Sequence, residues 1–382
     1  MDGNLLDIES IFPGRLGLQQ RVLPAYRGPL FDKLAERCQV GLGVFAGKGH
    51  PQESILAAEN LKIARYFPAR NLHFLQVNSR FYLLWQVNFL NWLRSWNPDG
   101  LIVEANPRYL STWLAIGWMH QRGRPVIGWG LGAPKIPSSS ALSWAGSVVQ
   151  TRARRSLLHS LDALVAYSRR GAEEYRQEGV PAERIFMAQN SVLPRPSWPP
   201  PARPHRFHGC PVVLFVGRLQ ARKRIDHLLR ACADLPAEFQ PRLLIVGDGP
   251  ARFELERLAS QVFPSAEFLG ARHGEGLAPF FRQADLFVLP GTGGLAIQEA
   301  MAYALPVIVA EGDGTQDDLV SPDNGWLVPG GDLAALKDAL EKALADPGRL
   351  RKMGGVSYQI VAERANIDAM ASVFIQAMCQ VA

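Results

Sequence analysis

The sequence predicts an α/β fold made of two doubly wound, Rossmann-like domains, and three observations support this. The chain has 382 residues, whereas a single domain usually has about 100–200. Residues 193–209 (LPRPSWPPPARPHRFHG) hold too much proline to continue a helix or a sheet, so they are interpreted as a linker. After this segment, apolar runs alternate with helical patterns, which predicts parallel strands joined by right-handed crossovers.

The segment after the linker has the clearer pattern. Its short apolar runs predict buried strands, and amphipathic stretches between them predict helices. The predicted strands are 211–217, 242–249, 266–270, 285–291, 305–312 and 326–328. The predicted helices are 221–235, 250–263, 276–283, 295–304 and 333–346.

The first part of the chain contains similar but less regular units. Its predicted strands are 39–47, 71–77, 100–106, 124–130, 163–168 and 184–191. Residues 80–97 (RFYLLWQVNFLNWLRSWN) carry three tryptophans and predict a helix. We favour a core helix, with an interfacial membrane helix as the alternative. The basic run 151–160 (TRARRSLLHS) is either a solvated face or a surface for anionic lipid.

These patterns predict four segments. They are a first domain at 1–192, a linker at 193–209, a second domain at 210–357, and a helix at 358–382 that returns to the first domain. Ligands of such sheets bind at the carboxyl ends of the strands. We therefore expect a ligand-binding cleft where the strand ends of the two domains face each other.

The composition is that of a soluble globular protein, with 47% apolar and 20% charged residues. No apolar run reaches the ~18–20 residues of a membrane-spanning helix. The N-terminal segment MDGNLLDIES is acidic and lacks the pattern of a signal peptide. Four scattered cysteines argue against a zinc site and favour a reducing cytosol. We therefore expect a cytoplasmic protein, with peripheral binding to the inner face of the cell membrane as a further expectation.

Charge is distributed unevenly along the chain. Residues 1–200 hold 23 Lys and Arg against 14 Asp and Glu, a net of +9, whereas the remainder holds 18 against 21, a net of −3. A basic half next to a slightly acidic one indicates an anionic partner for the first. Nucleic acid is one such partner, but no nucleic-acid motif appears in the sequence. A membrane surface or an anionic small molecule therefore fits at least as well as nucleic acid.

Residues 214–224 (LFVGRLQARKR) run from a strand that ends at Gly217 into a basic loop before a helix. Arg218 and Lys223 lie where strand ends face a ligand. A helix N-terminus attracts phosphate through its N–H groups, while Arg adds a bidentate fork and Lys a point charge. We therefore predict that both residues contact a phosphate. A solvated basic loop is the alternative, because two more arginines lie in this loop.

A glycine-rich connection follows the strand at 285–291. Gly291, Gly293 and Gly294 leave room for backbone N–H groups to close on an anion. Glu299, one and a half turns into the next helix, is suited to accept hydrogen bonds from ribose hydroxyls. A local cap or ion pair is its alternative role. The Gly-Asp-Gly turn with Asp248 fits helix capping and a ligand-adjacent position about equally.

Three loops of the first half are candidates for binding an acceptor. One is 24–31 (PAYRGPLF), one is 104–110 (EANPRYL), and one is the strand exit 126–135 (VIGWGLGAPK), which includes Lys135. We expect acceptor contacts from one of the three. The candidate residues are Tyr26, Arg27, Gly28, Glu104, Asn106, Arg108 and Trp129. The sequence has no HExxH, GxSxG or P-loop motif.

Residues 211–330 resemble the donor domain of GT-B glycosyltransferases of glycosyltransferase family 4. The resemblance rests on VGRLQARKRIDHLL, VGDGP, AEFLG, ADLFVLP, EAMAYALPVIV and DNGWLV in this order; in the first half it is loose. It implies two Rossmann-like domains facing a central cleft and transfer of a hexosyl or related group with retention of configuration. It also implies a nucleotide-diphosphate sugar as co-substrate, a glycan or lipid-linked acceptor, no nucleic-acid partner, no cofactor and no bound metal.

The same resemblance assigns roles to individual residues. Arg218 and Lys223 are implied to stabilise the diphosphate as catalytic residues, and Glu299 to hold the ribose. The implied donor-binding residues are Gly217, Arg218, Lys223, Gly291, Thr292, Gly293, Gly294, Leu295 and Glu299.

The sequence departs from the family pattern at four places, one of which is NSV at 190–192, where the family often has Asn-Gly-Val-Asp. The first glutamate of the family's pair, which touches or positions the donor sugar, falls on Gly291. Trp129 lies where the family has a first-domain histidine, and Arg224 where it has a glycine. A non-catalytic nucleotide-sugar-binding subunit or regulator is therefore a rival hypothesis. An epimerase or a phosphorylase on the same fold is another.

Overall fold

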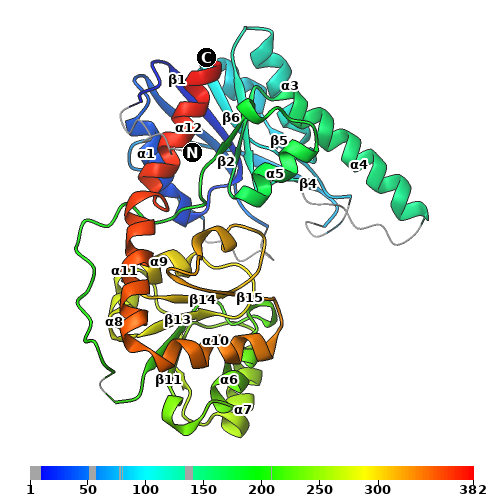
Figure 1. Cartoon of the computed structure of the whole chain (residues 1–382). Helices are drawn as coiled ribbons and strands as arrows, with labels where there is room; N and C mark the ends of the chain where they lie inside the picture. Colours follow the sequence, from blue (N-terminus) through cyan, green and yellow to red (C-terminus); the bar gives the residue numbers. More distant parts are fainter. Residues whose placement is uncertain (1–9, 51–56, 77–78, 80, 134–140, 208) are drawn as a thin grey trace. The chain divides into compact units, whose positions relative to one another are not determined.

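The computed structural model describes residues 10–50, 57–76, 79, 81–133, 141–207 and 209–382. It divides into two units, each built around one parallel sheet (Figure 1). Unit 1 is Met1–Pro194 together with Ile367–Ala382, and unit 2 is Arg195–Asn366. The predicted class, α/β with two Rossmann-like domains, is confirmed.

Unit 1 has a seven-stranded parallel sheet of order β3-β2-β1-β6-β7-β8-β9. Its strands are β1 (Arg15–Val22), β2 (Gly41–Gly47), β3 (Arg65–Pro68), β6 (Gly100–Glu104), β7 (Val126–Gly130), β8 (Ala163–Ala166) and β9 (Ile185–Met187). Its helices are α1 (Gly28–Glu36), α2 (Phe89–Trp96), α3 (Leu110–His120), α4 (Ala141–Ser160), α5 (Arg169–Gln177) and α12 (Ile367–Val381). A separate antiparallel pair joins β4 (Arg70–Phe74) to β5 (Leu83–Val87).

The sheet of unit 1 has an apolar core on each face. Along β6, Ile102 belongs to the cluster formed with α1 and α12, whereas its neighbours Leu101 and Val103 belong to the cluster formed with α2, α3 and α5. This alternation is expected of a strand, because successive side chains point to opposite faces. Both faces are therefore buried, as in a doubly wound sheet.

The helix predicted over 80–97 is wrong in its first half. Residues Leu83–Val87 form strand β5, Asn88 follows with a φ of 64°, and α2 begins only at Phe89. This left-handed residue separates the strand from the helix, because a right-handed helix cannot pass through it. Phe89 and Trp92 of α2 are buried, so the core interpretation of these aromatic side chains is correct.

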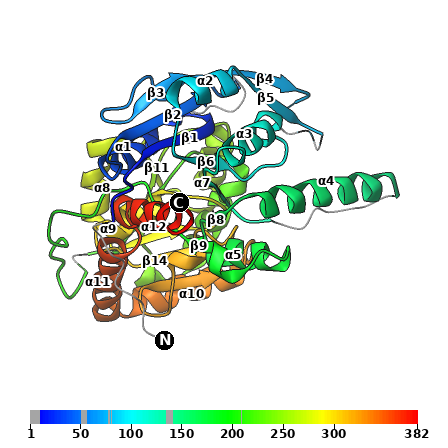
Figure 2. The same cartoon turned by 90° about the horizontal axis from the view of Figure 1, so that it is seen from above.

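Helix α4 carries the basic run 151–160, and it extends away from the body of unit 1 (Figure 2). Its last turns are anchored by the buried Leu157 and Leu158. Arg154 is not part of a solvated face, because it pairs with Glu178 at 2.5 Å and both side chains are largely buried. Within the described residues, no helix combines the length and the apolar character needed to cross a membrane.

Unit 2 has a six-stranded parallel sheet of order β12-β11-β10-β13-β14-β15. Its strands are β10 (Val212–Val216), β11 (Arg242–Val246), β12 (Glu267–Phe268), β13 (Leu286–Leu289), β14 (Val307–Ala310) and β15 (Gly325–Val328). Its helices are α6 (Ile225–Ala233), α7 (Arg252–Val262), α8 (Ala278–Gln283), α9 (Ala296–Ala302), α10 (Leu333–Ala345) and α11 (Pro347–Glu363). Five of the six strands lie within a run that the sequence predicted, and β15 begins one residue before the predicted strand 326–328.

The end of the chain forms two helices instead of one. The predicted helix 358–382 is interrupted after α11, where Asn366 is buried and its side-chain amide donates to the carbonyl of Val361 at 2.8 Å. Helix α12 then packs within unit 1: the ring of Phe374 lies 5.2 Å from that of Trp129, and the N–H of Ile367 donates to Leu193. The boundary between the units therefore falls after Asn366.

The proline-rich segment 193–209 is exposed at most of its described residues, but Arg203 anchors it to unit 2. From Arg195 onward it belongs to unit 2. The guanidinium of Arg203 donates to the carbonyls of Phe281 at 2.8 Å and Tyr303 at 3.0 Å. The predicted break in secondary structure is present, because no helix or strand forms in the described residues of this segment.

Candidate functional site

Two loops of unit 2 meet at the carboxyl ends of strands β10 and β13, which are neighbours in the sheet. The N–H of Thr292 donates to the carbonyl of Arg222 at 3.1 Å, and the Arg222 guanidinium donates to the carbonyl of Thr292 at 3.1 Å. The basic loop and the glycine-rich loop, which the sequence places at one candidate site, are therefore joined by reciprocal hydrogen bonds.

Lys223 lies at the centre of this junction. Its side chain is buried, with 6% of the residue exposed, and its ammonium donates to the carbonyl of Gly293. Burial lowers the pKa of Lys223 to about 8, and the nearby Arg222 adds to the effect. A cation in so little water interacts strongly with any anion that reaches it, because the local dielectric is low.

The glycine-rich loop requires a glycine at position 291, because a side chain there would clash with neighbouring backbone. A Cβ atom at Gly291 would lie 2.3 Å from the carbonyl oxygen of Arg222 and 2.5 Å from the carbonyl carbon of Lys223. In the family that the sequence resembles, this position carries a glutamate. Here the backbone of the basic loop fills the space that such a side chain would need. Gly293 has a φ of 71°, in the left-handed region that favours glycine.

Gln316 holds the glycine-rich loop in place. This side chain is buried; it accepts from the N–H of Gly293 at 2.7 Å and donates to the carbonyls of Gly291 and Ala310. The N–H groups of Thr292 and Gly293, predicted as anion donors, are therefore already used by protein partners. Sequence reasoning missed Gln316, which lies outside the motif and gives no local signal.

The remaining donor-site candidates are less constrained. Arg218 is exposed, directly after Gly217, and it makes no hydrogen bond or ion pair with a described residue. Glu299 lies in the first turn of α9, which begins one residue after Leu295. Its half-buried carboxylate makes no hydrogen bond or ion pair with the described part of the chain, and burial raises its pKa. Each of these two side chains can therefore bind a ligand without first breaking a hydrogen bond or an ion pair to a described residue.

The Gly-Asp-Gly turn is explained by packing. Asp248 does not cap α7; its carboxylate accepts from the N–H of Gly249 at 2.7 Å and from the guanidinium of Arg252 at 3.3 Å. A Cβ atom at Gly249 would lie 2.3 Å from the carbonyl oxygen of Leu219. The turn therefore packs directly on the backbone of the basic loop.

Replacing Arg224 with glycine is expected to stabilise unit 2. Arg224 has a φ of 52°, which costs an L-residue roughly 1–2 kcal/mol. Its ion pair with Asp226 is partly exposed and contributes little. We expect urea unfolding to show a gain of about 1 kcal/mol for Arg224→Gly. The control Arg257→Gly, inside α7, should lose about 1 kcal/mol, and a loss for both would contradict the prediction.

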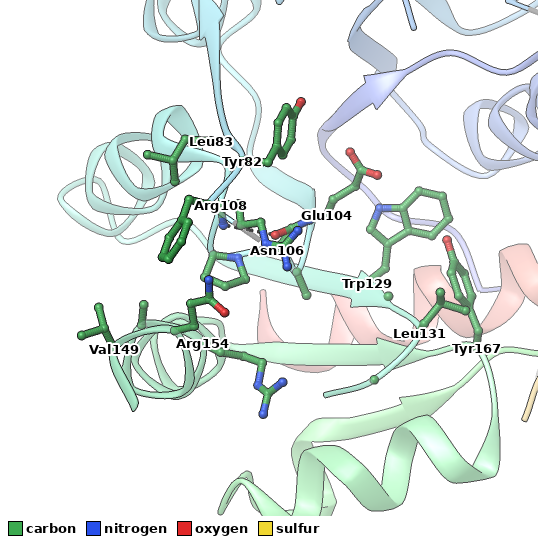
Figure 3. A pocket seen from close by; sticks show the side chains of 17 residues that line it. Tyr82, Leu83, Glu104, Asn106, Arg108, Trp129, Leu131, Val149, Arg154 and Tyr167 are labelled. Carbon is green, nitrogen blue, oxygen red and sulfur yellow. Dashed lines mark hydrogen bonds between the residues drawn. The ribbon is translucent and has the colours of Figure 1, made fainter. Parts of the chain in front are cut away.

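A second candidate site is a cavity of about 770 Å³ in unit 1 (Figure 3). It lies at the carboxyl ends of β6 and β7, the edge of a doubly wound sheet at which ligands bind. Four of the predicted acceptor-side residues line it, namely Glu104, Asn106, Arg108 and Trp129. The other lining residues are Phe81, Tyr82, Leu83, Ala105, Pro107, Gly130, Leu131, Gly132, Val149, Gln150, Ala153, Arg154 and Tyr167.

Glu104 ends strand β6 and is held from behind by a polar network. Its carboxylate accepts from the N–H of Arg21 at 2.5 Å, and its own N–H donates to the side chain of Gln19 at 3.2 Å. The buried Gln19 in turn donates to the side chain of Gln86 at 2.5 Å. Burial raises the pKa of Glu104 to about 7, an effect reduced by the bond from Arg21 and by the charge of Arg27.

Trp129 is the partner of Glu104 in the register of β6 and β7. The residue is 1% exposed, and its indole N–H has no hydrogen-bond partner among the described residues. A buried donor without a partner is costly, so such groups usually meet a ligand or water. Next to this pair, the N–H of Arg108 donates to the side chain of Asn106 at 3.1 Å.

The predicted candidates Tyr26, Arg27 and Gly28 do not line the cavity. Arg27 is buried, and its guanidinium donates to the carbonyl of Ser191 at 3.3 Å and lies 5.5 Å from the ring centre of Trp129. The charge of Arg27 therefore lies in the interior of unit 1. The predicted Lys135 lies outside the described residues.

The raised pKa of Glu104 predicts that the stability of unit 1 depends on pH. A carboxyl group whose pKa is raised to about 7 in the folded state holds its proton where the unfolded chain, near 4.5, has released it. Stability should therefore fall as pH rises from about 4.5 to 7. In urea unfolding we expect Glu104→Gln to reduce this fall by roughly 1–2 kcal/mol, because the partly exposed group is screened by solvent. Equal pH dependence in both proteins would contradict this.

Comparison with known proteins adds sequence and structural relatives. Residues 210–346 match the family model described as "Glycosyl transferases group 1". A GDP-mannose-dependent alpha-mannosyltransferase of Mycobacterium tuberculosis is 32% identical over 241 residues, covering 60% of this chain and 60% of that protein. The chain spans between 42% and 60% of the length of the first three mannosyltransferase relatives that it matches.

Two solved structures match almost the whole chain. Sucrose-phosphate synthase from Thermosynechococcus elongatus superposes with a TM-score of 0.70 at 22% identity, covering 96% of this chain and 98% of that one. HepE from Anabaena in complex with UDP gives a TM-score of 0.68 at 16% identity, with 96% and 99% covered. Residues 210–346 thus resemble the glycosyl transferases group 1 family, and the fold of the chain is that of the GT-B glycosyltransferases.

Proposed function

We propose that this chain is a glycosyltransferase that moves a sugar from a nucleotide-diphosphate sugar to an acceptor bound by unit 1. The observation that carries the proposal is the junction of Lys223 with the glycine-rich loop at adjacent strand ends. The matched family segment, 210–346, includes every residue of that junction. The donor is assigned to unit 2, with Arg218 and Lys223 at the diphosphate and Glu299 at the ribose.

The mechanism follows from where charge develops. Breaking the bond between sugar and phosphate gives an oxocarbenium-like sugar and a diphosphate leaving group. Cations already in position stabilise the growing negative charge of that leaving group. Lys223 is preorganised by burial, whereas Arg218 is free to close on a bound phosphate. We propose that these cations act without a bound metal and that the product retains the anomeric configuration of the donor.

GDP-mannose is our first candidate for the donor, because the mycobacterial relative is named as GDP-mannose-dependent. The test is a panel of GDP-, UDP- and dTDP-sugars, with thermal stabilisation and slow donor hydrolysis as readouts, each with and without EDTA. We expect one donor to stabilise the protein and to be hydrolysed equally in both conditions. NMR of the transferred sugar determines the anomeric configuration. The absence of both stabilisation and hydrolysis across the panel would oppose the proposal.

Gly291 supports a second candidate function, a nucleotide-sugar-binding subunit without transfer activity. The backbone of Arg222 and Lys223 occupies the space that a side chain at this position needs. No carboxylate can therefore reach the donor sugar from Gly291 in this arrangement. Stabilisation by nucleoside diphosphates without turnover on any acceptor favours this function, whereas turnover excludes it.

For the acceptor, we propose a glycan or lipid-linked molecule in surface-polysaccharide or lipid-linked glycan synthesis. The unit 1 cavity supports this, because hydrogen-bonding groups and apolar side chains both line it. Binding to an anionic membrane surface remains part of the same proposal. It is tested by retention on vesicles of phosphatidylglycerol at low salt. Failure to bind at low salt removes the membrane from the proposal and leaves the transfer reaction untouched.

A further inference from the structure

The cavity of unit 1 combines apolar side chains that are open to solvent with a buried indole N–H and a partly exposed carboxylate. Phe81 is 60% exposed, Leu131 is 49% exposed and Val149 is 66% exposed. Leu83 is 37% exposed. Exposed apolar side chains that gather at one cavity indicate a ligand with an apolar part, whereas single exposed ones need no explanation. We call Phe81, Leu83, Leu131 and Val149 the apolar rim.

The polar groups lie at the strand ends. Figure 3 shows Leu83 and Val149 on one side of the cavity, and Trp129, Tyr167 and Leu131 on the other. Glu104 adjoins Trp129 in the sheet register. The buried indole N–H of Trp129 and the second carboxylate oxygen of Glu104 have no hydrogen-bond partner among the described residues. We call these two residues the polar pair.

The chemistry of the polar pair selects for hydroxyl groups. Above about pH 7, where Glu104 has lost its proton, its carboxylate only accepts hydrogen bonds, whereas the indole N–H of Trp129 only donates. A hydroxyl group does both, so a ring with neighbouring hydroxyls satisfies the two residues together. An anion can accept from Trp129, but it is repelled by the carboxylate of Glu104. The cavity of about 770 Å³ is within the range of about 300–1,000 Å³ for small-molecule sites.

We propose that this cavity binds an amphipathic acceptor, a hydroxylated ring carried on an apolar chain. The ring hydroxyls bond to the carboxylate of Glu104 and the indole N–H of Trp129, and the chain leaves across the apolar rim. This inference rests on the proposed glycosyl transfer, because the ligand is an acceptor only if the protein transfers a sugar to it. The binding of such a molecule to unit 1 is testable without a donor.

The first experiment measures binding alone. Hexyl glycosides of glucose, galactose and mannose are titrated by calorimetry into the full chain at about pH 8.5, where Glu104 is ionised. The titrations stay below the micelle concentrations and contain no nucleotide. The corresponding methyl glycosides test the ring without the chain, and hexyl phosphate tests the chain with an anion. We expect one hexyl glycoside to bind at least about tenfold more tightly than its methyl counterpart, because the chain buries apolar surface. Hexyl phosphate should bind more weakly than that glycoside.

Two variants separate the ring from the chain. Val149→Ser should weaken the hexyl glycoside about threefold and leave the methyl glycoside unchanged, because it removes apolar contact only. The matched control is Val40→Ser, which alters another exposed valine of unit 1 outside the cavity. Glu104→Gln should weaken both glycosides about tenfold, since it removes a charge-assisted hydrogen bond.

A spectroscopic readout does not depend on these variants. The indole ¹H–¹⁵N resonance of Trp129, assigned from Trp129→Phe, should move on adding the hexyl glycoside and stay in place on adding hexyl phosphate. The inference is overturned if no hexyl glycoside binds, if hexyl phosphate binds best, or if Val40→Ser weakens binding as much as Val149→Ser. If the glycosides do not bind but a nucleotide sugar is hydrolysed, the cavity assignment fails while the proposed function stands.

Discussion

Lys223→Ala is expected to lower kcat/KM for glycosyl transfer by about 10²–10³, the usual effect of removing one preorganised donor of a charge-stabilising site. The buried ammonium lies at the junction of the two donor loops, where the leaving diphosphate is proposed to develop charge. A buried cation needs no reorganisation when the reaction occurs, so its loss is not compensated by water. The nucleoside diphosphate should also bind more weakly to the variant.

The pH profile gives an independent test of the same residue. Because the pKa of Lys223 is lowered to about 8 in the ligand-free chain, its ammonium is lost as pH rises through that value. Since kcat/KM reports ionisations of the free enzyme, activity should decline above about pH 8. Lys223→Ala should lack this decline. A pH profile of the same shape in both proteins would argue against Lys223 as the group that titrates.

Lys342→Ala is the matched control for Lys223→Ala. Lys342 lies in the same unit, on α10, and its side chain is 59% exposed with a partner at Asp338. Its removal should change neither activity nor nucleotide affinity. Urea unfolding of both variants shows whether lost activity reflects lost structure. Full activity of a folded Lys223→Ala protein would remove this residue from the catalytic site.

Unit 2 could be predicted strand by strand because its strands are short and parallel, and because four of them, β10, β11, β13 and β14, are largely buried. Such strands are continuous apolar runs, and the carboxyl end of β10 is marked by a glycine, Gly217. The first strand of unit 1 lacks this signal. β1 reads RLGLQQRV, and its buried Gln19 and Gln20 look like surface residues in the sequence. Gln19 is buried because it bonds to Gln86, a contact across 67 positions that no local pattern contains.

The candidate sites show the same limit. Lys223 and Gly293 were predicted together because each follows a strand in a recognisable motif. Gln316, which fixes the glycine-rich loop, stands alone in its segment and could not be predicted. Arg27 was placed on a ligand-facing loop, but it is buried under Trp129 and Tyr167. A motif predicts which strand end a residue follows, whereas burial depends on packing from distant parts of the chain.

Asp285→Ala is expected to destabilise unit 2 by about 3–5 kcal/mol, the usual cost of breaking a buried ion pair from one side. Asp285 bonds to the guanidinium of Arg351 at 2.6 Å, and their side chains are only 15% and 10% exposed. Its second oxygen accepts from the N–H of Val212, at the start of β10, at 2.9 Å. Burial and Arg351 together lower the pKa of Arg203 to about 10, whereas Asp285 raises it. Without Asp285 these two cations lose their shared counter-charge.

Urea unfolding of four further variants, including the single variant Arg351→Ala, tests this explanation. Asp338→Ala, which breaks the exposed pair with Lys342, should cost less than about 1 kcal/mol. Asp285→Asn retains an acceptor for Val212 and should fall between the two. In the double variant Asp285→Ala/Arg351→Ala, the loss should be smaller than the sum of the single losses, because no unpaired guanidinium is left at Arg351. Additive losses would mean that Asp285 acts through the N–H of Val212 alone, and that its ion pair with Arg351 contributes nothing to the stability of unit 2.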